Sequence, residues 1–186
     1  MRAALLGIDL GTTAAKVGWF DAADGHALAV ERVEYTPLSP QPGWVELDAE
    51  VYWQAVVAAT RRALAQVGPV EVLGVGLSSQ GQTFVPLDAR MRPLRPAIVW
   101  LDTRAEQQTR WLQENLDLEQ FRRRTGADAP NSVASAPKML WIRQYEPQVW
   151  QRTRRLMMLP DWIGWRLTGQ RRLDVHNAGS THLVDR

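Results

Sequence analysis

The sequence contains no cysteine, which excludes disulfide bonds, thiol catalysis and cysteine-ligated zinc. No stretch approaches the roughly 18 consecutive apolar residues of a membrane-spanning helix, so we expect no membrane partner. The apolar stretch at residues 3–8 ends at Asp9 without a cleavage-site pattern, so no signal peptide is expected. Internal repeats and low-complexity segments are also lacking. These features together predict a cytoplasmic globular protein.

The composition that remains is that of a folded globule. The chain has 186 residues, of which 45% are apolar and 23% charged, and nine are Trp. This length suits a single domain. The net charge is only +2, although arginines cluster at residues 122–124, 154–155 and 171–172. Such clusters can bind phosphates, but we favour a solvated helix face or a domain-contact surface. A nucleic-acid binder would bind DNA with a steep salt dependence, and we expect no nucleic-acid partner.

The first part of the chain alternates between strands and turns. Three short apolar stretches predict an antiparallel meander with a hairpin turn at Asp24-Gly25: residues 4–10, 16–20 and 26–35. Residues 36–43 hold three prolines and predict a loop. Asp48 is a candidate N-cap for a helix that ends before Gly68-Pro69.

The second part begins with strands and then becomes mostly helical. A buried strand is expected over residues 70–79, followed by short strands over 83–87 and 97–101. Thr103 and Glu106 form the T-x-x-E pattern of a capping box, which predicts a helix to about Leu116. The remaining expected elements are three helices, 118–124, 136–145 and 160–167, and a strand over 156–159.

Residues 7–13, Gly-Ile-Asp-Leu-Gly-Thr-Thr, have the chemistry of a phosphate-binding loop. Gly11 lets a phosphate approach backbone N–H groups, because no Cβ obstructs it. Thr12 and Thr13 offer hydroxyl and amide donors to phosphate oxygens. Asp9 could hold Mg²⁺ against the same phosphates, and Lys16 adds positive charge nearby. For a bare D-x-G-T pattern, a plain hairpin turn would be the favoured interpretation.

The setting of this loop between two apolar strands resembles the first phosphate loop of the actin, sugar-kinase and heat-shock-chaperone ATPase superfamily. It is not a Walker loop, because the G-x-x-x-x-G-K-[ST] pattern is missing. It is not a Rossmann fingerprint either, because no G-x-G-x-x-G opens a helix here.

Further segments, in order along nearly the whole chain, resemble motifs of the FGGY carbohydrate kinases, in particular the xylulokinase branch. They are P-G-W-V-E-L-D at 42–48 with Trp53, G-V-G-L-S-S-Q at 74–80, W-L-D-T-R at 100–104, A-P-K-M-L-W at 136–141, L-P-D at 159–161 with R-L-T-G at 166–169, and N-A-G-S-T at 177–181. The resemblance implies an α/β, ribonuclease-H-like fold, with a mixed five-stranded sheet and helices on both faces. It implies ATP-dependent phosphorylation of a sugar or polyol hydroxyl, with Mg²⁺ as the metal.

The resemblance also assigns roles to individual residues. Asp9 would organise Mg²⁺ and ATP, and Gly11, Thr12, Thr13 and Lys16 would hold the phosphates. The residues implied to contact the sugar are Gln80, Gly81, Gln82, Trp100, Asp102 and Arg104. Gln82 departs from the Met-His pair of xylulokinases and from the Arg-Glu pair of glycerol kinases, which leaves the substrate open.

Simpler interpretations remain for each sugar-site candidate. Gln80 and Gln82 could be exposed turn residues, and Asp102 could only help to cap a helix. Trp100 is equally compatible with the core, and Arg104 could form an ion pair on a helix surface. His176 and His182 are interpreted as incidental.

Two further observations concern substrate and completeness. Val133 and Ala134 stand where glycerol kinases carry an aromatic residue, which argues against a glycerol site of that kind. The family's general-base aspartate would lie beyond Arg186, as would the C-terminal nucleotide domain. We therefore expect residues 1–186 to be an N-terminal sugar-binding portion with little turnover and a possible homodimer partner. The alternatives are a non-catalytic sugar-binding or regulatory module on the same fold and a chaperone- or actin-like ATPase domain.

Overall fold

The structure is a computed structural model, and it describes residues 1–185. Its contacts divide the chain into two compact units, although the sequence shows no linker. The first unit holds residues 1–36 and 49–80, and the second holds residues 37–48 and the chain from Gly81 onward. No helix among the described residues is both long enough and apolar enough to cross a membrane.

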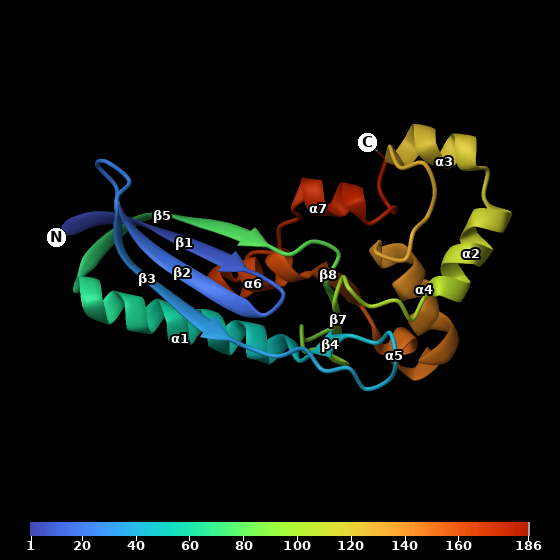
Figure 1. Cartoon of the computed structure of the whole chain (residues 1–186), viewed down its shortest axis with the longest axis horizontal. Helices are drawn as coiled ribbons and strands as arrows, with labels where there is room; N and C mark the ends of the chain where they lie inside the picture. The colour runs from blue at the N-terminus through green and yellow to red at the C-terminus, as the bar shows by residue number, and fades with distance from the viewer. Residues whose placement is uncertain (186) are drawn as a thin grey trace. The chain divides into compact units, whose positions relative to one another are not determined.

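The first unit is a mixed sheet with one helix on it (Figure 1). Its elements are β1 (Arg2–Leu10), β2 (Ala14–Asp21), β3 (Ala27–Glu34), α1 (Ala49–Val67) and β5 (Val70–Ser79). The strand order is β3-β2-β1-β5, in which β1 and β5 are parallel and the other neighbours antiparallel. The expected meander, helix and following strand are thereby confirmed. Asp48 directly precedes α1, as the predicted N-cap requires.

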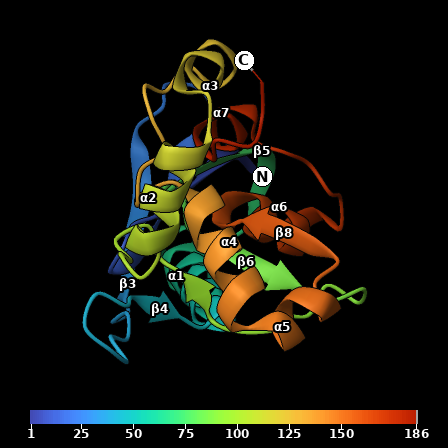
Figure 2. The same cartoon turned by 90° about the vertical axis from the view of Figure 1, so that its right-hand side faces the viewer.

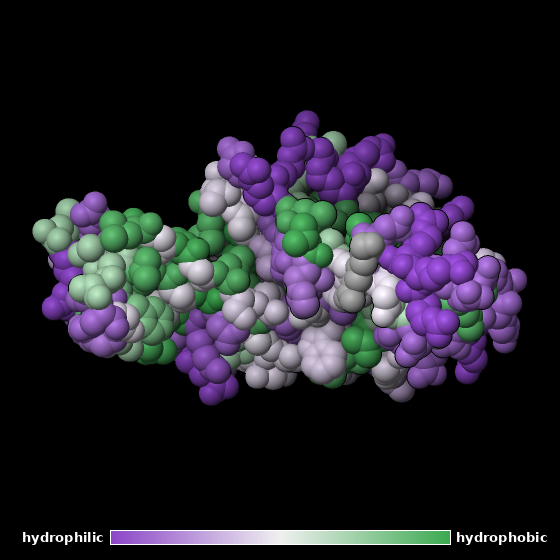
Figure 3. All heavy atoms as spheres, turned by 90° about the horizontal axis from the view of Figure 1, so that it is seen from above, coloured by the Kyte–Doolittle hydropathy of each residue, from purple (hydrophilic) through white to green (hydrophobic). Residues whose placement is uncertain are grey.

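Buried and exposed side chains alternate along β1, and this alternation indicates which face of the sheet α1 covers. Leu6, Ile8 and Leu10 of β1 are buried and lie on the face that packs against α1, with Tyr52 and Val56 of the helix. The side chain of Leu5, on the opposite face, is 42% exposed. Figure 3 shows hydrophobic surface over this unit, in green.

The ribonuclease-H-like class is confirmed, but two details of the expected sheet differ within the described residues. The sheet has four strands instead of five, and no helix of the first unit covers its second face. The reason is that the chain leaves this sheet after β5 and enters the second unit. Among residues 1–185, no strand pairs with the outer edge of β5, and Val72 and Val75 are about half exposed.

The second unit is a small antiparallel sheet surrounded by helices (Figure 2). The strand order is β4-β7-β6-β8, with β4 (Glu46–Leu47), β6 (Phe84–Leu87), β7 (Ala97–Ile98) and β8 (Arg155–Met158). The helices are α2 (Glu106–Asn115), α3 (Leu118–Thr125), α4 (Ser135–Tyr145), α5 (Pro147–Arg152), α6 (Leu159–Thr168) and α7 (Val175–Ser180). Phe84, Ile98, Ile142 and Met158 form the centre of its core.

The predicted capping box at the start of α2 is wrong. The helix begins at Glu106, and its N-cap residue Ala105 makes no side-chain hydrogen bond to it. The Thr103 hydroxyl instead donates to the carbonyl oxygen of Gly43, at 3.3 Å. A contact across 60 residues of sequence therefore takes the place of the local cap.

Candidate active site: a phosphate loop and a sugar pocket

The phosphate loop is the tight turn between β1 and β2. The N–H of Gly11 donates to the carbonyl oxygen of Ala14 at 2.9 Å, and a Cβ on Gly11 would approach that oxygen to 3.3 Å. Asp9 and Lys16 are direct partners in the antiparallel register, so their side chains share one face of the sheet. The structure thus brings an acidic and a basic side chain together beside a glycine turn.

A groove of about 470 Å³ lies on this face of the first unit. Asp9, Lys16, Phe20 and Ser78 contribute side chains to it. Glycines floor it, because Gly7 pairs with both Gly18 and Gly76 in the register. The Phe20 ring covers two of these glycines, because a Cβ on Gly7 would lie 3.0 Å from it and a Cβ on Gly18 2.7 Å from it. A Cβ on Gly76 would meet nothing within 4 Å, so the groove is open there.

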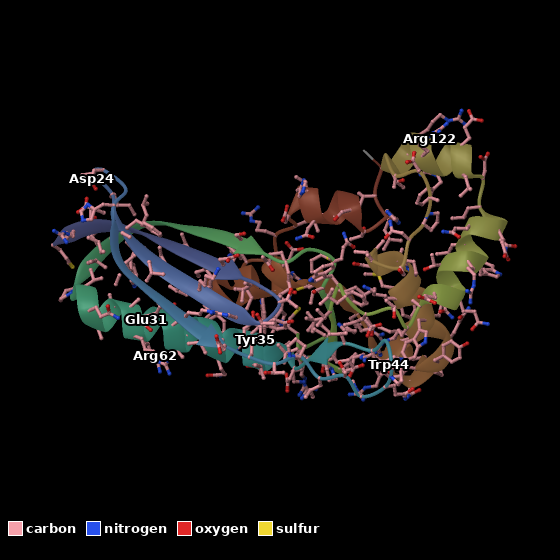
Figure 4. The ribbon with its side chains drawn as sticks, in the orientation of Figure 1. Asp24, Glu31, Tyr35, Trp44, Arg62 and Arg122 are labelled. Atoms are coloured by element: carbon pink, nitrogen blue, oxygen red, sulfur yellow. The ribbon has the colours of Figure 1, made fainter. Side chains whose placement is uncertain are left out.

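Tyr35 fixes the phosphate loop, which sequence reasoning missed. Its hydroxyl donates to the carbonyl oxygen of Gly11 at 2.7 Å, and its N–H donates to that of Thr13 at 2.9 Å. Its ring packs edge-on against Tyr52, with centroids 5.0 Å apart. Burial raises the pKa of both phenols above their usual value, so both remain donors at neutral pH. Figure 4 labels Tyr35, which directly follows β3.

Gln80 belongs to the first unit, with the phosphate loop, rather than to the unit that holds the other sugar-site candidates. Its N–H donates to the carbonyl oxygen of Leu10 at 2.7 Å, and its Nε2 donates to the Tyr52 hydroxyl at 2.9 Å. Its Oε1 is buried and has no hydrogen-bond partner among the described residues. Gln80 is therefore not a freely exposed turn residue.

Gln82 is held rigidly in the second unit. Its backbone is left-handed, with φ of 58°, and the residue is 7% exposed. Its Oε1 accepts hydrogen bonds from the N–H of Ser135 at 2.9 Å and from the Ser135 hydroxyl at 2.8 Å, while its Nε2 donates to the Ser180 hydroxyl. The neighbouring Gly81 packs so closely that a Cβ there would lie 3.3 Å from Oδ1 of Asn177. The exposed-turn interpretation does not hold for Gln82.

A pocket of about 270 Å³ opens beside Gln82 in the second unit. Its wall is mainly small and apolar, and the residues that line it include Gln82, Val133, Ala134 and Ser180. A few oriented polar groups on an apolar wall are typical of small-molecule sites. His182, interpreted from the sequence as incidental, also lines this pocket.

Trp100 is partly buried and lies two residues after the end of β7. Its N–H donates to the hydroxyl of Thr83 at 3.1 Å, which ties it to the residue that follows Gln82. Its carbonyl oxygen accepts a hydrogen bond from Nζ of Lys138 at 2.8 Å.

Asp102 and Arg104 have fully buried side chains and bind each other. Nη2 of Arg104 lies 2.7 Å from Oδ2 of Asp102 and 2.7 Å from Oε1 of Glu46. The guanidinium carbon lies 3.9 Å from the ring centroid of Trp44 and 4.9 Å from that of Trp141. The 42–48 and 100–104 motifs therefore meet in one charged cluster, which includes Trp44, labelled in Figure 4.

Two more cations complete this cluster, and neither was predicted from the sequence. Arg95 contacts Glu46 and also Glu146, the latter at 3.2 Å, and burial lowers its pKa. Lys138 is fully buried, and burial lowers its pKa to about 8. A buried charge needs a partner or a set of hydrogen bonds, so these ion pairs and hydrogen bonds fix the packing of the segments that supply them.

Among the described residues, no group of three or more His, Asp or Glu side chains could hold a metal ion. The Asp9 carboxylate beside the loop is the candidate ligand from the sequence. Mg²⁺ commonly binds one or two protein carboxylates and completes its shell with water and substrate phosphates. The single carboxylate of Asp9, next to hydroxyl groups that can donate hydrogen bonds to phosphate, fits that kind of site.

Comparison with known proteins identifies the family. The model of the FGGY family of carbohydrate kinases, N-terminal domain, matches residues 4–185. The chain is 32% identical to the xylulose kinase of Escherichia coli (strain K12) over 97% of its length, and 32% identical to glycerol kinase 1 of Saccharolobus solfataricus. It spans only 36% and 37% of those two proteins.

Solved structures agree with this result. The xylulose kinase from Rhodospirillum rubrum superimposes with a TM-score of 0.93 at 28% identity, over 98% of this chain and 37% of that one. The Plasmodium falciparum glycerol kinase with ADP gives a TM-score of 0.89 at 26% identity, over 99% of this chain and 38% of that one. The chain belongs to the FGGY family of carbohydrate kinases, of which it carries the N-terminal domain.

Proposed function

We propose that this chain is the sugar-binding portion of an enzyme that transfers a phosphoryl group from ATP to a hydroxyl of a sugar or polyol. The observation that carries the proposal is the family match over residues 4–185, together with the oriented amide of Gln82 at a small pocket. The proposed use of ATP is also the reason to expect a cytoplasmic enzyme.

On the phosphate side, Asp9 would hold Mg²⁺ and thereby the phosphates of ATP. The ion would neutralise charge on the transferring group, which is the main requirement of a loose phosphoryl-transfer transition state. Gly11, which lacks a Cβ, would let a phosphate approach the turn closely, and the hydroxyls of Thr12 and Thr13 would donate to phosphate oxygens. Lys16 would add a positive charge on the same face as Asp9.

On the sugar side, Gln82 would contact the substrate directly. Trp100, expected as part of the sugar floor, is not among the residues that line this pocket, so it would act through its backbone bonds to Thr83 and Lys138. The Ser135 hydroxyl bonds to Oε1 of Gln82, and Nε2 of Gln82 donates to the Ser180 hydroxyl, so the orientation of the amide is fixed. Nε2 carries two N–H groups, and the second is left to donate to a substrate oxygen. Asp102 and Arg104 would not touch the substrate, because their side chains are fully buried and bind each other. They would act indirectly, by holding the backbone of the second unit in place. Gly81 would permit the close packing beside Asn177.

A ketopentose such as xylulose is the proposed substrate class. Val133 and Ala134 line the pocket without an aromatic ring, which leaves room for a chain longer than glycerol. The general-base aspartate and the adenosine site are proposed to lie in sequence after Arg186. This part rests on the resemblance and on the 36–37% of the two relatives that the chain spans.

Calorimetry of the chain with D-xylulose, D-ribulose and glycerol tests the sugar site. We expect D-xylulose or D-ribulose to bind, and Gln82→Leu to abolish that binding while Gln107→Leu, on the exposed face of α2, leaves it unchanged. Failure of all three compounds to bind would overturn the proposed function.

A kinase assay tests catalysis separately. The isolated chain should turn over far more slowly than about 1 s⁻¹, the low end for kinases, whereas a longer protein that contains it should phosphorylate the sugar that binds. If that longer protein binds sugar and ATP but transfers no phosphate, the alternative of a non-catalytic sugar-binding module is correct.

A further inference from the structure

The buried ammonium group of Lys138 joins two segments of the second unit. Lys138 projects from the first turn of α4 and is completely buried. Its Nζ donates to the carbonyl oxygens of Trp100 at 2.8 Å, Val133 at 3.1 Å and Val99 at 3.4 Å. The first and third belong to the segment that follows β7, and the second belongs to the loop before α4.

Both segments bear on the sugar pocket. Val133 lines the pocket itself. The backbone N–H of Trp100 donates to the hydroxyl of Thr83, the neighbour of Gln82. A carbonyl oxygen in a loop has no partner in a regular ladder, so the oxygens of Trp100 and Val133 need another donor, whereas that of Val99 also accepts the N–H of Asp102. Here one side chain supplies donors to both segments at once.

We propose that Lys138 is a positioning residue, whose ammonium group holds the pocket wall at Val133 against the Val99–Trp100 segment in the geometry that binds the sugar. The proposal rests on the proposed function, because it deepens the account of the same pocket. Lys138 acts through the backbone of its three acceptors and does not line the pocket itself.

The chemistry of the amine makes this bridge sensitive to pH. An ammonium group has three N–H donors for the three carbonyl oxygens, whereas the neutral amine has two, so deprotonation removes one bond and also the charge that strengthens the other two. The Val99 oxygen additionally accepts the N–H of Asp102 at 3.0 Å, so the bonds to Trp100 and Val133 are the ones that depend on Lys138. Burial lowers the pKa of Lys138 to about 8; the nearby Asp102 favours the charged form and Arg104 opposes it. The bridge should therefore be complete at pH 7 and weakened above pH 8.

The composition of the chain offers a direct probe, because Lys16 and Lys138 are its only lysines. Biosynthetic labelling with ¹³C-lysine gives two ε-methylene NMR signals, and Lys16→Arg assigns them. The Lys138 signal is titrated from pH 6.5 to 10 with and without saturating D-xylulose. The affinity for D-xylulose is measured by calorimetry over the same range.

The proton on Lys138 and the sugar must change each other's binding free energy by the same amount, and this reciprocity gives the expected result. We expect D-xylulose to bind about fivefold more weakly at pH 9.5 than at pH 7, at the low end of typical coupling. The Lys138 titration midpoint should then rise by about 0.7 pH units when the sugar is bound. Lys138→Met should bind weakly at both pH values.

Each other outcome has a distinct meaning. If D-xylulose binds but the Lys138 midpoint stays where it was, Lys138 serves stability alone and the inference is wrong, while the proposed function stands. If neither D-xylulose, D-ribulose nor glycerol binds at pH 7, the proposed function fails and the inference falls with it. Should Lys138→Met not fold, the titration of the unmodified chain still decides.

Discussion

Replacing Arg104 by Met should strongly destabilise the second unit. The side chains of Arg104 and Asp102 are both fully buried, and they lie 2.7 Å apart. The substitution leaves the Asp102 carboxylate buried without its charge partner. Breaking a buried ion pair from one side typically costs about 3–5 kcal/mol. The loss includes the stacking of the guanidinium on Trp44 and Trp141, worth about 2 kcal/mol where desolvated.

Urea unfolding followed by Trp fluorescence measures this loss, because Trp44 and Trp141 are in contact in the second unit. With m-values of about 1–3 kcal/mol/M, the midpoint should fall by on the order of 2 M. Arg123→Met is the matched control, since Arg123 forms an exposed ion pair with Glu119 on α3, and its midpoint should not change measurably.

Adding Asp102→Asn to Arg104→Met should recover part of the stability. The amide still accepts the N–H of Val45 through its oxygen, and it removes the uncompensated charge. A loss below about 1 kcal/mol for Arg104→Met, as for a surface pair, would refute the reasoning about this cluster. So would a double variant that is less stable than the single one.

Three further outcomes are expected. Gly43→Ala should lower the urea midpoint, because Gly43 has φ of +77° and a Cβ there would lie 2.6 Å from the Thr103 hydroxyl; an unchanged midpoint would contradict this. Ser135→Ala should weaken D-xylulose binding in calorimetry, because Oε1 of Gln82 loses a donor; equal affinity would show that the amide needs no such support. The lowered pKa of Lys138 means that the unfolded chain binds more protons between pH 8 and 9.5, so this residue should add about 2 kcal/mol to the unfolding free energy across that window. Urea midpoints that fall over this window would contradict that sign.

The first unit was largely predictable from the sequence because its signals are local. The alternation of β1, the turn at Gly11 and the helix after Asp48 each depend on neighbours within a few residues. Asp9 and Lys16 were expected together, and the antiparallel register pairs them directly. Tyr35 escaped notice because its two bonds to the loop span more than 20 residues of sequence.

The second unit was less predictable because distant residues decide it. Thr103 and Glu106 match a capping box, yet the hydroxyl of Thr103 bonds to Gly43 instead. Arg104 looked like a surface or substrate residue, and only the partners Glu46 and Trp44 explain its burial. The sequence alone does not show whether a charged side chain forms a buried ion pair or is exposed to solvent.

The second unit is built from two separate segments of the chain, so no single continuous gene fragment encodes it alone. Residues 37–48 are encoded between β3 and α1, yet they carry Glu46, which binds Arg95 and Arg104. A gene fragment that starts at codon 81 would leave both arginines without that carboxylate. To be expressed alone, the unit needs residues 37–48 joined to the chain from Gly81 onward by a designed linker that replaces residues 49–80.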